Sequence, residues 1–91
     1  MIITKHAESR MVQRGISRDL VEILWSYGRA RFANGAAIID MDEEGISSYL
    51  RDDPASQRQA IDKLKKVYLV TIDLAVVTVA RANANYKKKF H

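Results

Sequence analysis

The chain contains 91 residues, of which 47% are apolar and 29% are charged, and it carries a formal net charge of +4. These values predict one folded domain over residues 1–91 and exclude a wholly disordered chain. The sequence has no cysteine and only two histidines, which excludes disulfides, thiolate nucleophiles and a histidine-rich metal cage, so we expect no cofactor and no metal.

The first half of the chain predicts two helices in succession. Thr4 is a suitable N-cap for a helix over Lys5–Arg14, and Gly15 can take the left-handed position that ends it. Ser17 then caps a second helix over Arg18–Tyr27. Apolar residues occupy one broad side of that second helix, so it is expected to pack on a core.

A hairpin and further helical segments are expected in the middle of the chain. Asn34-Gly35 separates two extended runs, Arg29–Ala33 and Ala36–Met41, and Asn-Gly is the strongest short-range hairpin signal because both residues accept positive φ. Helical spacing then predicts a short helix over Ile46–Arg51. A further helix is expected over Pro54–Lys66, because Asp53 can cap it and proline suits a first turn.

The last part is rich in β-branched residues and predicts a second hairpin. Its strands are Val67–Ile72 and Ala75–Arg81, joined by a tight turn at Asp73-Leu74. Residues 83–91 are polar and basic, and we expect a mobile tail there. The order is therefore two helices, a hairpin, a further helical segment and a C-terminal hairpin. This order predicts an α+β fold with a small antiparallel sheet.

Charge is distributed unevenly along the chain. Residues 1–31 carry six basic and three acidic side chains, residues 32–62 carry two and seven, and residues 63–91 carry seven and one. If the basic ends meet in space, they form a face that attracts phosphate backbones. The alternative is an ordinary solvated surface. No apolar run approaches the ~20 residues that cross a bilayer and no signal peptide is visible, so we expect a cytoplasmic protein without a membrane partner.

The first predicted helix holds the most informative side chains. His6, Arg10, Gln13 and Arg14 fall within about 100° of one helix face. An imidazole exchanges protons near neutral pH, and guanidinium groups bind phosphate, so this pattern suits metal-independent cleavage of RNA.

An ordinary helix flank is the alternative explanation of the same residues, and the residues alone favour it. Each arginine can cap a neighbouring carbonyl or pair with Asp40 or Asp42, and those acidic residues are themselves read as part of a solvated turn. No second proton-transfer group is evident. Tyr49 and Tyr68 are candidates, but half-buried packing is the expected role of both.

The opening string H-A-x-x-R-M-x-x-R-G-I over residues 6–16 resembles the signature of a small, uncharacterised bacterial domain family. Counterparts of later family features are Tyr27-Gly28, Asn34-Gly35 and the strand Val76–Arg81. The family is similar in architecture to the barnase/EndoU/colicin/RelE group of ribonucleases, which often act as bacterial toxins. That similarity is an analogy of fold.

The resemblance implies a site of five residues. His6 would be the general acid or base, and Arg10 and Arg14 would hold the scissile phosphate. Thr78 would donate a hydrogen bond and Arg81 would add a cation from the last strand. In a regular strand Thr78 and Arg81 point to opposite faces, so both can join one site only if the strand bulges or ends near Arg81.

Three functions remain open from the sequence. The first is a metal-independent endoribonuclease of a bacterial toxin–antitoxin module, acting on RNA and masked by an acidic antitoxin. The second is a non-catalytic domain that binds nucleic acid or protein. The third is a structural or oligomerising protein without a reaction.

Overall fold

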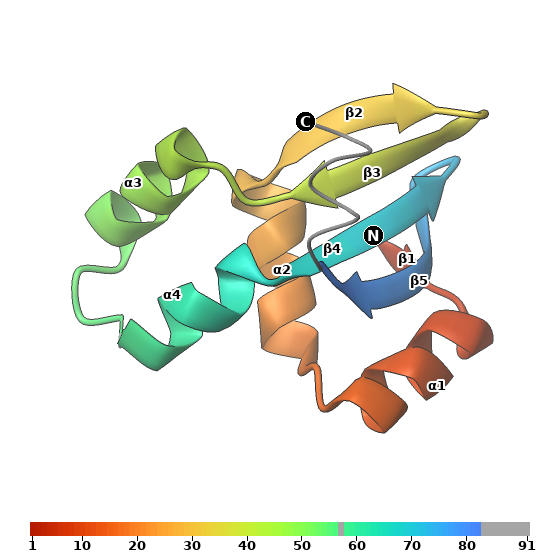
Figure 1. The fold of residues 1–91 in the computed structure, drawn as a ribbon, viewed down its shortest axis with the longest axis horizontal. Coiled ribbons are helices and arrows are strands. Elements are labelled where there is room, and N and C mark those ends of the chain that lie inside the picture. The colour runs from red at the N-terminus through yellow and green to blue at the C-terminus, as the bar shows by residue number, and fades with distance from the viewer. Residues whose placement is uncertain (57, 83–91) are drawn as a thin grey trace.

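A mixed β-sheet organises the chain in the computed structural model, which describes residues 1–56 and 58–82 (Figure 1). The elements are β1 (Ile2–Ile3), α1 (Lys5–Arg14), α2 (Arg18–Tyr27), β2 (Arg29–Ala33), β3 (Ala36–Asp40), α3 (Glu43–Asp52), α4 (Arg58–Lys65), β4 (Val67–Ile72) and β5 (Ala75–Arg81). This arrangement confirms the predicted α+β class. The predicted tail, residues 83–91, lies outside the described residues.

The sheet has the strand order β1-β5-β4-β3-β2 within the described residues. Strands β2 to β5 form the two predicted hairpins, and β3 and β4 pair antiparallel to join them. Strand β1 was not predicted, and it pairs parallel with β5 through Ile2↔Ala75 and Ile3↔Val76. Two residues are too few for an alternating pattern, so only tertiary contact reveals this strand.

The first two helices begin and end where the sequence predicts. The hydroxyl oxygen of Thr4 accepts a hydrogen bond from the Ala7 amide at 3.1 Å, and that of Ser17 accepts one from Leu20 at 3.2 Å. Gly15 ends α1 in the left-handed conformation, with φ of 63°. Each of these signals is local, so it can be read without knowledge of the rest of the fold.

The following helices differ from the prediction. Helix α3 starts at Glu43, three residues before the expected Ile46, because Asp42 caps it by accepting the Gly45 amide at 2.8 Å. Asp53 is the C-cap of α3, and α4 begins only at Arg58. The expectation that Asp53 caps a helix starting at Pro54 is therefore wrong.

One face of the sheet forms the core with the helices. Residues of α1, α2, α3 and α4 share a single apolar cluster with β3, β4 and β5, and Figure 1 shows α1 beside β5 and α2 crossing behind β3 and β4. The register shifts beside Val70 and Thr71, so that Val77 is an extra residue in β5 and both Val76 and Val79 are fully buried. Among the described residues, the largest fully buried side chains are those of Val21, Leu24, Leu64, Leu69, Val76 and Val79.

Both hairpins turn through two residues of positive φ. Asn34 and Gly35 have φ of 52° and 78°, and Asp73 and Leu74 have φ of 49° and 66°. Such turns match the right-handed twist of paired strands, and they favour asparagine, aspartate and glycine. Leu74 is thus the unusual residue, because a leucine in the left-handed region is strained.

Candidate functional site

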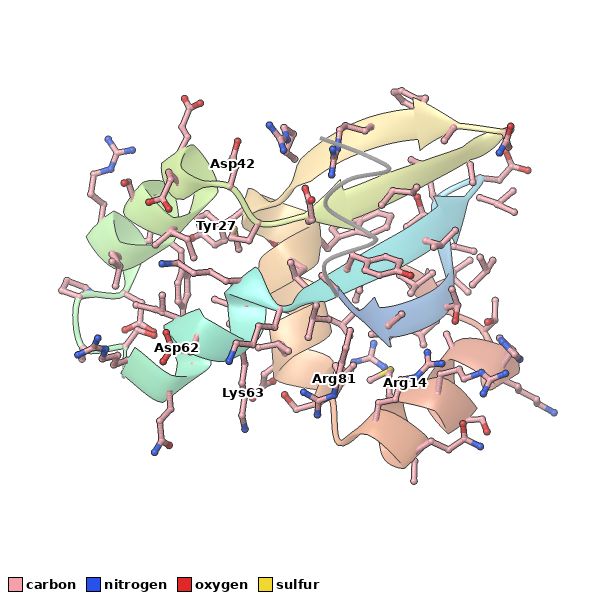
Figure 2. The ribbon with its side chains drawn as sticks, in the orientation of Figure 1. Arg14, Tyr27, Asp42, Asp62, Lys63 and Arg81 are labelled. Carbon is pink, nitrogen blue, oxygen red and sulfur yellow. The ribbon has the colours of Figure 1, made fainter. Side chains whose placement is uncertain are left out.

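Two of the five predicted site residues join α1 to β5. The Arg14 guanidinium donates from Nη1 to the backbone carbonyl of Val79 at 2.5 Å, and the Arg81 guanidinium donates from Nη2 to the carbonyl of Arg14 at 2.7 Å. Figure 2 shows both side chains at the junction of helix and strand. The Arg14 carbonyl belongs to the last turn of α1, where carbonyls lack helical partners, so Arg81 caps the helix.

A second pair of predicted residues lies on the outer surface of α1. Arg10 donates from Nε to Nε2 of His6 at 3.4 Å and from Nη1 to the side-chain carbonyl of Gln13 at 3.0 Å. His6 and Gln13 are exposed and Arg10 is half-buried. An imidazole ring and a guanidinium group therefore lie side by side on this face of α1.

Thr78 lies apart from both groups. It pairs with Val70, whereas Arg81 pairs with the buried Val67. Thr78 and Arg81 are three positions apart in the regular part of β5, so their side chains point to opposite faces of the sheet. Arg81 shares the face of Val67 toward the helices, and Thr78 faces away from them. The bulge in β5 precedes Thr78 and leaves this relation unchanged. The five residues therefore do not form the single cluster that the resemblance implies.

A buried charge cluster, which the sequence reasoning missed, occupies the sheet face opposite the helices. Asp40 is 6% exposed and contacts Arg31 at 2.5 Å and Arg29 at 3.9 Å. Asp40 also stands opposite Tyr68 in the β3–β4 register. The reading of Asp40 as part of a solvated turn is wrong, because Asp40 is the last residue of β3 and its side chain is buried.

Described residues line three cavities around the helices and the hairpin tips. Two of about 390 and 380 Å³ flank Tyr27, and a third of about 570 Å³ lies beside Trp25 and Phe32. None of the five predicted residues lines any of these three cavities. The first two are polar or acidic, whereas the third is mostly apolar.

Tyr27 has a specific partner between the first two cavities, where Figure 2 labels it. Its hydroxyl donates to Oδ2 of Asp52 at 2.6 Å, and its ring meets that of Tyr49 edge-on at 5.4 Å. The hydrogen bond to the Asp52 carboxylate raises the pKa of Tyr27 above its ordinary value of 10.0, because it stabilises the neutral phenol.

We expect Tyr27 to ionise above pH 10, and Asp52→Asn to lower its pKa. Since the pKa is raised in the folded chain, this contact stabilises the fold fully below pH 10 and loses its effect as pH rises through the folded value. The measurement is a carbon-13 NMR titration of the tyrosine ring carbon that bears the hydroxyl. Asp62→Asn is the control, because Asp62 is an exposed carboxylate of α4 that does not contribute to the raised pKa of Tyr27. Ionisation of Tyr27 at or below pH 10 would contradict the assignment.

Comparisons of the chain with protein-family models, with curated proteins and with solved structures found no match. Among residues 1–56 and 58–82, no helix is long and apolar enough to span a membrane. The same residues contain no group of three or more histidine, cysteine, aspartate or glutamate side chains placed to hold a metal ion.

Proposed function

We propose that this protein is a metal-independent endoribonuclease that works through His6 and Arg10 on the outer face of α1. One observation carries the proposal: the Arg10 guanidinium lies beside the His6 imidazole, with Nε 3.4 Å from Nε2, on the outer face of α1. A proton acceptor and a phosphate-binding cation thus stand side by side. Arg14 and Arg81 are placed outside the reacting centre, because they hold α1 on β5.

The reaction follows from these two side chains. When a phosphodiester binds, the Arg10 guanidinium turns from His6 to the phosphate oxygens and leaves Nε2 available. Nε2 takes the proton of the ribose 2′-hydroxyl while the 2′-oxygen attacks phosphorus. The bond from phosphorus to the 5′-oxygen breaks, and water protonates the leaving oxygen. The products are a 2′,3′-cyclic phosphate and a 5′-hydroxyl end, and His6 then returns its proton to solvent.

The proposed partners follow from the same chemistry. RNA is the substrate and would be met inside the cell, in the cytoplasm. An acidic antitoxin protein would mask the outer face of α1 and prevent cleavage for as long as the antitoxin stays bound. Binding of nucleic acid without cleavage is the second candidate, and the engagement of Arg14 with Val79 favours it, since only one arginine of α1 is left beside His6.

A cleavage assay separates the two candidates. We expect the purified chain to cleave single-stranded RNA in the presence of a metal chelator, and His6→Ala to reduce the rate by about 10²-fold or more. Arg10→Ala should reduce it by roughly 10²-fold through lost stabilisation of the phosphate charge. Arg18→Ala is the matched control, because Arg18 is an exposed helix arginine that pairs with Glu22 on α2.

The products and the binding data complete the test. Fragments ending in a 2′,3′-cyclic phosphate support the mechanism, and circular dichroism of each variant checks that it is folded. Salt-dependent RNA binding with no cleavage by the wild type would leave the non-catalytic candidate. Cleavage that survives His6→Ala would reject the proposal.

A further inference from the structure

We propose that a second basic surface, formed where α1, α4 and β5 end, holds the phosphate backbone of single-stranded RNA. We call this surface the basic junction, and its side chains are those of Arg14, Lys63, Lys66 and Arg81. The inference rests on the proposed function for the choice of RNA as the ligand. It adds a binding surface, separate from His6 and Arg10, for the same RNA.

Backbone contacts bring the four residues of the basic junction together. The Ala82 amide, which follows Arg81, donates to the Lys66 carbonyl at 2.6 Å. The Lys66 amide in turn donates to the Lys63 carbonyl at 3.1 Å. On the other side, Nη2 of Arg81 donates to the Arg14 carbonyl at 2.7 Å. Figure 2 shows Lys63, Arg81 and Arg14 in this order along the lower side of the view.

The basic junction joins the two basic parts of the sequence. Arg14 belongs to residues 1–31, and the other three side chains belong to residues 63–91. Residues 32–62, which carry the excess of acidic side chains, contribute none of the four. The positive charge of both parts is therefore concentrated on one surface, and such a surface attracts phosphate groups.

The positive charge of this surface is not neutralised within the described residues. Arg14 and Arg81 donate to backbone carbonyls, which orient the guanidinium groups without cancelling their charge. No carboxylate of the described residues forms an ion pair with any of the four side chains. Like charges gathered without a counter-charge repel one another, so a bound anion stabilises the arrangement.

The nearest sources of negative charge leave this balance unchanged. Asp62 precedes Lys63 on α4, but it forms no ion pair with Lys63 or Lys66 in the part of the chain that the structure describes. Residues 83–91 contain no aspartate or glutamate. An anion that neutralises the basic junction is therefore expected from a ligand.

The side chains suit phosphate contacts that do not depend on base sequence. A guanidinium has five N–H donors, and Arg81 uses Nη2 to cap α1, so Nε and Nη1 remain to contact a phosphate. The cap also holds the Arg81 side chain in place, which reduces the entropy lost on binding. Lys63 and Lys66 are exposed, and an ammonium group acts as a point charge for phosphate.

The same surface is less suited to a protein partner. None of the four side chains lines any of the three cavities described above. Protein interfaces depend on apolar or aromatic anchors that fill pockets, whereas contacts to a nucleic-acid backbone depend mainly on charge. Charge without an apolar pocket therefore favours RNA over an acidic protein.

Binding of an RNA that resists cleavage tests the inference on the full chain. The probe is a fluorescent 2′-O-methyl RNA of about 12 nucleotides, which is within the usual range of single-strand sites and lacks the hydroxyl that the proposed reaction needs. We expect saturable binding whose affinity falls as salt rises. An oligomer of the same sequence with uncharged methylphosphonate linkages should bind at least about tenfold more weakly.

The two lysines provide the variants, because neither side chain forms a hydrogen bond or ion pair within the described residues. Lys63→Gln and Lys66→Gln should each weaken binding about fivefold at 0.1 M salt and reduce the salt slope by about 0.7. Arg51→Gln is the matched control: it removes the same charge from the exposed face of α3 and should leave the affinity unchanged. Circular dichroism checks that each variant is folded.

Three outcomes would overturn the inference. The first is the absence of binding, or equal affinity for the charged and the uncharged oligomers. The second is an equal loss for Arg51→Gln and the lysine variants, which would show that only total charge matters. The third is binding of a polyglutamate peptide of equal charge as tightly as the RNA, which would assign the surface to an acidic protein.

The outcomes for binding and for cleavage are distinct. RNA that is bound through the two lysines but never cleaved would reject the proposed ribonuclease and keep the basic junction as a binding surface. Cleavage that depends on His6, with no effect of either lysine on binding, would keep the ribonuclease and reject the basic junction.

Discussion

Asp40→Ala is expected to lower the free energy of unfolding by about 3–5 kcal/mol, which is a large part of the stability of a small domain. Asp40 is buried, and its carboxylate contacts Arg31 closely and Arg29 more distantly. The substitution removes the carboxylate that both guanidinium groups contact. The Arg31 guanidinium then stays largely shielded from water without that carboxylate. The cost comes from the arginine charges that stay behind more than from the lost attraction.

Urea denaturation of matched variants checks this expectation. Asp62→Ala removes a carboxylate from the exposed side of α4 and should change stability by less than about 0.5 kcal/mol. Replacing Asp40 and Arg31 together with leucine should restore much of the loss, because well-packed apolar residues often match a buried ion pair. A loss below about 1 kcal/mol for Asp40→Ala would contradict the assignment.

Gly28→Ala is expected to cost about 3 kcal/mol, through overpacking where α2 meets β3. An added Cβ would lie 2.4 Å from the Leu24 carbonyl oxygen, 2.6 Å from Cγ2 of Ile39 and 3.0 Å from the Asp40 carbonyl oxygen. Two of these three neighbours are backbone atoms, so a change of side-chain rotamer cannot relieve the contact. The φ of Gly28 is −72°, so close approach rather than backbone conformation requires glycine here.

Gly35→Ala is the control that separates the two reasons for a glycine. Gly35 has φ of 78°, and an added Cβ there meets nothing within 4 Å. Its replacement should therefore cost only the strain of a left-handed alanine, about 1 kcal/mol. Thermal unfolding of both variants gives the comparison, and a loss for Gly28→Ala no larger than that for Gly35→Ala would show that the α2–β3 junction can move apart.

Local signals account for the part of the fold that the sequence predicted. The caps of α1 and α2 and the Asn34-Gly35 turn depend on neighbouring residues only, so they can be read in order along the chain. The start of α3 was placed too late because Asp42 was read as part of an acidic turn instead of an N-cap. Strand β1 depends on contact with β5, more than 70 residues later, which no local pattern reports.

In the candidate site too, the contact within one helix was predicted and the contacts between elements were not. Helical periodicity alone brings His6 and Arg10 together, and the structure shows this contact. The roles of Arg14 and Arg81 depend on how α1 packs on β5, which periodicity does not give. The Asp40 cluster was missed, although the spacing of Arg29 and Arg31 along β2 is a signal that could have revealed it.

The contacts of α1 with β5 affect how tightly the outer face of α1 can bind a ligand. The Thr4 amide donates to Val76 at the start of the helix, and Arg14 and Arg81 link its last turn to the same strand. A helix held at both ends loses little motion when a ligand arrives, so more of the contact energy appears as affinity. Loosening either end should therefore speed ligand release even where every contacting side chain is retained.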